Sequence, residues 1–187
     1  MHSPQLFRRH LIESWHRLES TPVELIGKYS PLLNEHELDT PITIVEEGRI
    51  YKFSSVYNYV MFYKYRLSDD PRAQKICKLA NNIYTTSSTL KTIIEELDVH
   101  DPAHWNVFLY PYLLTGNLKK YDEDRELRSL LLSTGHRDIK ARCFKHSVTI
   151  EERLFKKVAN TDQVDFKTLN LFGNVLMNVR THIRSFS

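Results

Sequence analysis

One predicted helix carries a lysine and a tyrosine on the same face, a cation and an aromatic ring that could contact a ligand. Tyr57, Met61 and Lys64 recur at i, i+4 and i+7 in a predicted helix that follows a serine cap at position 54 or 55 and runs to about residue 67. Residues at this spacing share one face of a helix. The lysine could hold a phosphate group, and the tyrosine could stack on a base. The alternatives are a solvated surface lysine and a core tyrosine.

Three further residues could take part in the same kind of binding. Tyr59 and Trp105 offer aromatic faces for a base, although aromatic residues at helical spacing are more often part of a core. Arg180 could contact phosphate. It falls in the last turn of a predicted helix over about 163–184, so it could equally interact with the helix dipole there.

Helices and one hairpin must position these side chains. Apolar residues recur at helical spacing through most of the chain, and prolines after Asp70 and Asp101 mark helix starts. A segment with three prolines is predicted to be a loop with short turns, over 21–41. The predicted helices cover 4–19, 54/55–67, 71–81, 88–98, 102–119, 122–133, 149–159 and 163–184.

Two short β-prone runs flank Gly48 and predict a small hairpin near residues 42–53, the only clear strand signal. With only five glycines, the 187-residue chain lacks the turns of an all-β fold. The sequence therefore predicts a mainly α fold in a single domain, 1–187. Within it, a helical and looped N-terminal extension, 1–41, would pack on a core formed by 42–187.

Composition limits the classes of function. The net charge of +3 permits contact with phosphate but does not require it. Cys77 and Cys143 have no neighbours spaced as zinc ligands, so we expect buried free thiols, as in a reducing cytosol. No signal peptide and no membrane span is visible. We expect a cytoplasmic protein without metal or other cofactor.

Three segments, spanning roughly 42–181, resemble the pattern of the NADAR (YbiA-like) N-glycosidase family. The first is similar to Ser-Val-Glu-His-Tyr-x-x-x-x-Lys, the second to Lys-Phe with a later Leu-Leu-x-Thr-Gly, and the third to Asn-x-Leu-Gly-x-x-Leu-Met-x-x-Arg. Their matching positions, in this order along the chain, are Ser55, Val56, Asn58, Tyr59 and Lys64; Lys120, Tyr121, Leu127, Leu131, Thr134 and Gly135; Asn170, Gly173, Leu176, Met177 and Arg180.

The resemblance implies a multihelical YbiA-like fold and a role in breaking N-glycosidic bonds. Members of the family hydrolyse early riboflavin-pathway intermediates or remove ADP-ribose from modified guanine, and some oppose DarT-type toxins. Divergent forms in large phages are similar to anti-DarT factors, whose location would be the host cytoplasm. By the same resemblance Lys64 is an active-site lysine, and Asn58, Tyr59 and Asn170 occupy binding positions.

The acidic residues of the family are replaced in this chain. Cleavage of a ribosyl–base bond passes through an oxocarbenium-like state, which calls for a carboxylate and a proton donor. The family's first Glu falls on Tyr57, and its second falls near Lys140 or Ala141. The Asp-x-x-Trp-Gly-x-Gly segment has no counterpart in CFKHSVTIEERLF.

Other acids and histidines could take over. Glu151 and Glu152 open the helix predicted over 149–159, although acidic residues also favour helix N-termini for electrostatic reasons. Asp138 follows the Thr-Gly pair closely. His136 and His146 titrate near neutral pH and could donate a proton, or could be ordinary surface histidines. We take Glu152, Glu151 and Asp138 as the candidate catalytic residues.

Three hypotheses follow. The chain could be an enzyme that counteracts ADP-ribosylation of nucleic acid, or that acts on ribosylamino-pyrimidine intermediates of the riboflavin pathway. It could instead be a degenerate scaffold that binds modified DNA or inhibits the ADP-ribosyltransferase toxin. It could also be a helical interaction module with an accidental resemblance. The basic segment 136–146 could follow a phosphate backbone or be a solvated loop. The expected partners are an ADP-ribosylated nucleic acid or nucleotide, and such a toxin.

Overall fold

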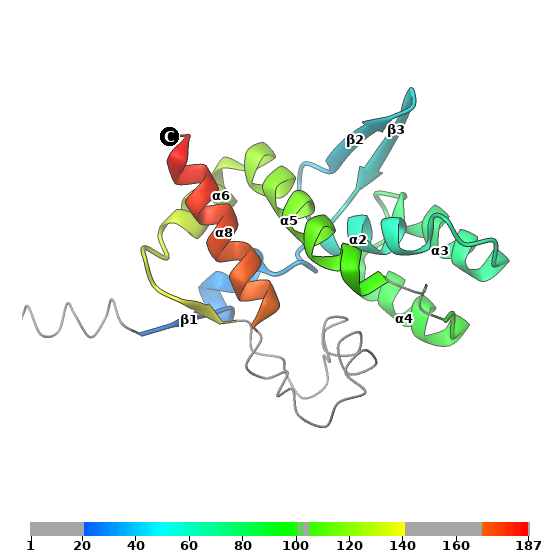
Figure 1. Ribbon diagram of the computed structural model, residues 1–187, viewed down its shortest axis with the longest axis horizontal. Helices are drawn as coiled ribbons and strands as arrows, with labels where there is room; N and C mark the ends of the chain where they lie inside the picture. Colours follow the sequence, from blue (N-terminus) through cyan, green and yellow to red (C-terminus); the bar gives the residue numbers. More distant parts are fainter. Residues whose placement is uncertain (1–20, 101, 103–104, 141–169, 187) are drawn as a thin grey trace, which may run out of the picture.

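The computed structural model describes residues 21–100, 102, 105–140 and 170–186 (Figure 1). Its helices are η1 (Gly27–Leu32), α2 (Val56–Tyr65), α3 (Pro71–Ala80), α4 (Ser87–Leu97), α5 (Trp105–Glu123), α6 (Arg125–Leu132) and α8 (Leu171–Ser185). Its strands are β1 (Val23–Glu24), β2 (Ile42–Glu46), β3 (Arg49–Phe53) and β4 (Ile139–Lys140). The helices predicted over 4–19 and 149–159 lie outside the described residues.

The predicted hairpin is confirmed. Strands β2 and β3 are antiparallel, with Ile42 opposite Phe53 and Glu46 opposite Arg49. The two turn residues between them, Glu47 and Gly48, both have positive φ, 50° and 76°. Two residues with positive φ form the tight turn whose twist suits a two-residue hairpin loop. In Figure 1 the hairpin projects away from the helices.

A second small sheet was not predicted. Strand β1 pairs in parallel with β4, with Val23 opposite Ile139, so residues from two distant parts of the sequence lie side by side. Strands of two residues carry too little alternation for a sequence pattern to show. The prediction of a mainly α fold is therefore correct only in part. Helices predominate in the described part of the chain, but two small sheets make the fold an α/β arrangement.

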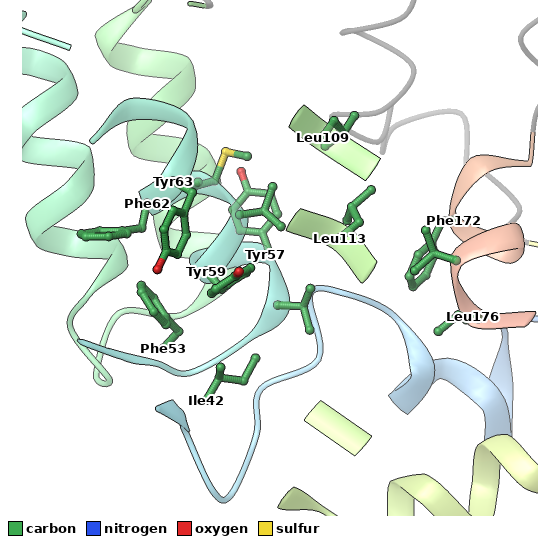
Figure 2. Packing of buried hydrophobic residues seen from close by; sticks show 14 of the residues in the cluster. Ile42, Phe53, Tyr57, Tyr59, Phe62, Tyr63, Leu109, Leu113, Phe172 and Leu176 are labelled. Atoms are coloured by element: carbon green, nitrogen blue, oxygen red, sulfur yellow. The ribbon is translucent and has the colours of Figure 1, made fainter. Parts of the chain in front are cut away.

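Helix α2 is the centre of the core. All ten of its residues are buried, because α3, α5 and the β2–β3 hairpin pack around it. It begins where the sequence predicts, since the Oγ of Ser55 accepts a hydrogen bond from the backbone N–H of Asn58 at 3.1 Å. Figure 2 shows Phe53, Tyr59 and Phe62 gathered where α2 meets the hairpin.

Helix α5 links α2 to the rest of the molecule, because it packs against α2 and also against α8 (Figure 1). A Cβ atom at Gly116 would lie 2.8 Å from the ring of Tyr59 and 3.1 Å from Val56, so glycine allows the close approach of α5 to α2. The helix runs to Glu123, beyond the predicted end at 119. The next helix starts later than predicted, because Asp124 caps it by accepting from the N–H of Leu127 at 2.9 Å.

Candidate functional site on helix α2

The face of α2 that carries Tyr57, Met61 and Lys64 is enclosed by the protein. The exposed fractions of the three residues are 5%, 1% and 7%. The ammonium of Lys64 lies 5.1 Å from the centre of the Tyr65 ring, a cation–π distance. Lys64 is therefore not a solvated surface lysine. Tyr57 occupies the position that the family pattern gives to Glu, directly within this buried face.

Asn58 holds the start of α2 in place. Its Nδ2 donates to the Oγ of Ser54 at 3.0 Å and to the backbone oxygen of Thr85 at 2.7 Å. Its Oδ1 is buried and accepts no hydrogen bond. The side chain thus connects α2 to the segment that precedes α4. Ser87, the first residue of α4, donates its hydroxyl to the Oγ of Ser55 at 2.7 Å.

Tyr59 and Trp105 belong to a row of aromatic rings. Tyr59 meets Phe53 edge to face at 5.4 Å between ring centres. Tyr112 lies between two nearly parallel rings, at 4.7 Å from Tyr63 and 5.6 Å from Trp105. Trp105 is 4% exposed and its Nε1 donates no hydrogen bond. Because Tyr112 covers one face of Trp105, at most the other face is free to stack on a base.

The sequence did not single out Asn34 and Asn117, which support the N-terminus of α2. The backbone oxygen of Asn34 accepts from the N–H of Tyr57 at 2.9 Å, and its Oδ1 accepts from the Nδ2 of Asn117 at 3.0 Å. The ammonium of Lys120 donates to the backbone oxygens of Pro31 and Leu33, both at 2.8 Å. Helix α5 thus fixes residues 31–34 against α2. A signal was present, because Asn117 and Lys120 interrupt the apolar face of α5.

Burial governs the electrostatics of Lys120, which is 1% exposed. Loss of water around the ammonium lowers its pKa to about 7, against the opposing influence of Glu35 and Asp124. The amine is enclosed and engaged with carbonyl oxygens, so it serves the framework beneath the site rather than its accessible face.

One described carboxylate, that of Glu46, contacts α2, but it does so on the side of the helix that faces away from Lys64. Glu46 accepts from the hydroxyl of Tyr63 and from Arg66 at 2.6 Å, and these hydrogen bonds lower its pKa. At 100° per residue, Arg66 points away from Lys64 on the opposite side of the helix. Glu46 therefore does not replace the missing family Glu at Tyr57.

The remaining predicted binding residues lie where α6, β4 and α8 meet. Arg180 donates through one nitrogen to the Oγ1 of Thr134 at 2.7 Å and to the backbone oxygen of Arg137 at 2.8 Å. The Nδ2 of Asn170 donates to the backbone oxygen of Ile139 at 2.6 Å. Placing Arg180 in the last turn of its helix was wrong. Helix α8 continues to Ser185, and its last-turn basic residues are His182 and Arg184.

The candidate acids are not assembled around Lys64 in the described part of the chain. The side chain of Asp138 is exposed, while its backbone oxygen accepts from the N–H of Val23 at 2.6 Å. His136 is exposed next to Arg184, with 3.3 Å between the nitrogens. Glu151, Glu152 and His146 lie outside the described residues, so their roles stay predictions.

One of the two cysteines lies within the described residues and can be compared with the prediction of a buried free thiol. Cys77 is a buried free thiol, and burial raises its pKa to about 11. Cys143 lies outside the described residues. In the described ranges, His, Cys, Asp and Glu side chains form no group of three suited to a metal ion. Among the helices described, none combines the length and apolar character needed to span a bilayer.

Comparison with known proteins agrees with this arrangement. A family model described as the NADAR domain matches residues 27–184. The solution NMR structure of the E. coli protein YbiA superposes with a TM-score of 0.61 at 16% identity, covering 89% of this chain and 87% of that one, which shows a shared fold. The search of curated proteins found no match. Because the family model extends from η1 into the last turn of α8, the chain belongs to the NADAR domain family of N-glycosidases.

Proposed function

We propose that the protein counteracts ADP-ribosylation of nucleic acid by cleaving the N-glycosidic bond between ADP-ribose and the modified base. The observation that carries the proposal is Lys64, which keeps the lysine of the family pattern and is 7% exposed on the face of α2 that it shares with Tyr57. A lysine retained at such a position suits the binding of a phosphorylated ribose.

Cleavage breaks the bond between the anomeric carbon and the base nitrogen. Water adds its oxygen to that carbon, and a proton passes to the leaving base. A neutral phenol at Tyr57 cannot offset the charge of the ribosyl cation as a carboxylate does. We assign this role to Glu152, with Glu151 and Asp138 as the other candidates. Arg180 contributes indirectly, since it binds the loop that carries Asp138.

The test uses single-stranded DNA that is ADP-ribosylated on guanine, and mass spectrometry to detect free ADP-ribose. Wild type should release ADP-ribose, and Lys64→Ala and Glu152→Ala should each lower turnover while the protein stays folded. Lys75→Ala is the matched control, because Lys75 is exposed on α3. Full activity in both the Lys64 and Glu152 variants would exclude this assignment of residues.

A second candidate function is binding without turnover, which the replacement of the family Glu by Tyr57 favours. In this case the protein would sequester ADP-ribosylated DNA or inhibit the ADP-ribosyltransferase that modifies it. Wild type would then bind the modified DNA or the toxin and release no ADP-ribose, and Tyr57→Glu would gain the ability to release it. A ribosylamino-pyrimidine in the same assay tests the riboflavin-pathway alternative.

A further inference from the structure

Three arginines converge on the loop between α6 and β4. Arg180 and Arg184 are one turn apart on α8, and Arg137 belongs to the loop. The guanidinium of Arg180 donates to the backbone oxygen of Arg137 at 2.8 Å, and that of Arg184 donates to the backbone oxygen of Gly135 at 2.9 Å. Arg137 itself donates to the backbone oxygen of Thr134 at 3.0 Å. The three positive groups therefore surround residues 134–137.

Within residues 21–100, 102, 105–140 and 170–186, which the structure describes, no ion pair neutralises the positive charge of this cluster. The hydrogen bonds that these arginines make within the described residues go to carbonyl and hydroxyl oxygens or to His136, and the ion pairs found there involve other arginines. Asp138 is the acid with an electrostatic effect on Arg180, and its side chain is exposed. The like charges of Arg184 and Arg137 add to burial in lowering the pKa of Arg180.

Capping of α6 accounts for only part of the cluster. The C-terminus of a helix carries about half a negative charge, which one cation can balance. Three guanidinium groups exceed this requirement. In addition, the Nε of Arg180 is buried and has no hydrogen-bond acceptor, although buried donors normally have one. An anion with several oxygens bound at the accessible guanidinium groups would supply the missing negative charge.

Exposed basic residues extend the cluster to the surface. Arg184 is half-buried, and His136 beside it is exposed. The hydroxyl of Tyr29 accepts from Arg137 at 3.1 Å, and the ammonium of the exposed Lys28 lies 4.9 Å from the centre of the Tyr29 ring. We call Lys28, His136, Arg137, Arg180 and Arg184 the α6–α8 basic cluster.

We propose that the α6–α8 basic cluster binds the phosphodiester backbone of the nucleic-acid strand whose modified base enters the site at Lys64. The inference rests on the proposed function and adds a second contact region for the same substrate. Helix α5 packs against both α2 and α8 (Figure 1), so one helix separates Lys64 from the basic cluster. A strand can thus be held by its phosphates at α8 while one nucleotide is presented at α2.

Binding of an unmodified single-stranded DNA oligonucleotide tests the cluster apart from catalysis. Fluorescence anisotropy between about 50 and 200 mM salt gives the affinity and its dependence on salt. Arg184→Gln and Lys28→Gln should each weaken binding several-fold and reduce the slope of log K against log salt by about 1. Lys75→Gln, which removes an exposed charge on α3, should leave both unchanged.

Further measurements distinguish backbone phosphate from free phosphate as the ligand of the cluster. They also distinguish DNA binding by the cluster from the proposed release of ADP-ribose. Arg184→Gln should slow release of ADP-ribose from a modified oligonucleotide but not from a modified mononucleoside, because only the oligonucleotide has a backbone. A further outcome is that the cluster variants bind DNA more weakly than wild type while wild type releases no ADP-ribose. That result would contradict the proposed activity and support the proposed DNA binding by the basic cluster. Equal affinities and salt slopes for wild type, Arg184→Gln and Lys28→Gln would overturn the inference. Competition by inorganic phosphate at micromolar concentration would also overturn it, in favour of a free-phosphate site.

Discussion

The junction of α6, β4 and α8 differs from the buried face of α2 in what remains of the family pattern. At the junction, Thr134 and Arg180 bond to each other, Asn170 binds β4, and Gly135 adopts a left-handed conformation at φ 62°. These residues hold main chain in place. On α2 the lysine remains, but the Glu is replaced by Tyr57. The pattern is thus kept where it determines the backbone and altered where chemistry would occur.

The sharpest way to test this difference is Gly173→Ala. A Cβ atom there would collide with the backbone oxygen of Ile139 and the side chain of Asn170, and the oxygen cannot move without displacing β4. We expect a loss of about 3 kcal/mol in the free energy of unfolding, measured by urea denaturation. Thr181→Ala, on the exposed side of the same helix, should change it by less than about 0.5 kcal/mol. Equal free energies of unfolding for Gly173→Ala and Thr181→Ala would contradict a structural role of the junction.

Arg180→Met should have the next largest effect. The substitution keeps much of the side-chain volume but leaves the buried Oγ1 of Thr134 and the backbone oxygen of Arg137 without their donor. We expect a loss of about 2 kcal/mol in the free energy of unfolding. Arg125→Met, at an exposed position of α6, serves as the control. A stable Arg180→Met protein would show that the arginine is retained for ligand binding instead of for the fold.

Lys120→Met should alter the pH dependence of stability. The folded pKa of Lys120 is about 7 and the ordinary value is 10.5. Between these values the unfolded chain binds more protons, so the wild-type free energy of unfolding should rise with pH, by about 1 kcal/mol per pH unit relative to Lys120→Met. Urea denaturation at about pH 7 and pH 9 measures this slope. Lys119 is exposed next to Lys120, so Lys119→Met should keep the wild-type slope of the free energy of unfolding against pH. If Lys120→Met also kept the wild-type slope, the prediction would be contradicted.

Lys64→Met should have the smallest effect on stability. The substitution removes the cation–π contact with the Tyr65 ring and also removes a buried charge, so we expect a change of about 1 kcal/mol in the free energy of unfolding. Binding or release of ADP-ribose should nevertheless be lost. A thermal denaturation curve and the mass-spectrometric assay on one preparation separate the two effects. If Lys64→Met lost as much stability as Arg180→Met, the buried face of α2 would be as important for the fold as the junction of α6, β4 and α8, which would contradict the comparison.

Local structure could be predicted from the sequence where neighbouring residues determine it. Helix α3 begins at its proline because the carboxylate of Asp70 accepts from the N–H of Arg72 at 2.8 Å. The hairpin follows from Gly48 between β-prone runs. The β1–β4 pair could not be predicted, because it depends on two residues from each of two distant segments.

For the candidate site, as for the fold, the sequence predicted what neighbouring residues determine and not what distant segments contribute. Helical spacing placed Tyr57 and Lys64 on one face, but it gave no measure of how deeply either is buried. The support that Asn34 and Asn117 give to α2 depends on a side-chain contact between distant elements, which no local pattern encodes. Arg180 lies one turn before the last turn of α8, although the predicted end of that helix at residue 184 is only one residue from the observed end at Ser185.

The position of β1 has a practical consequence for anyone who trims the chain. The family match begins at residue 27, whereas β1 covers Val23–Glu24. A chain shortened to the family boundary would lose Val23 and Leu25, each 2% exposed, and would leave β4 as an unpaired edge. Unpaired edges invite aggregation. The folding unit therefore starts upstream of the boundary that sequence similarity defines. The pairing of β1 with β4 connects two segments that enclose most of the described chain between them.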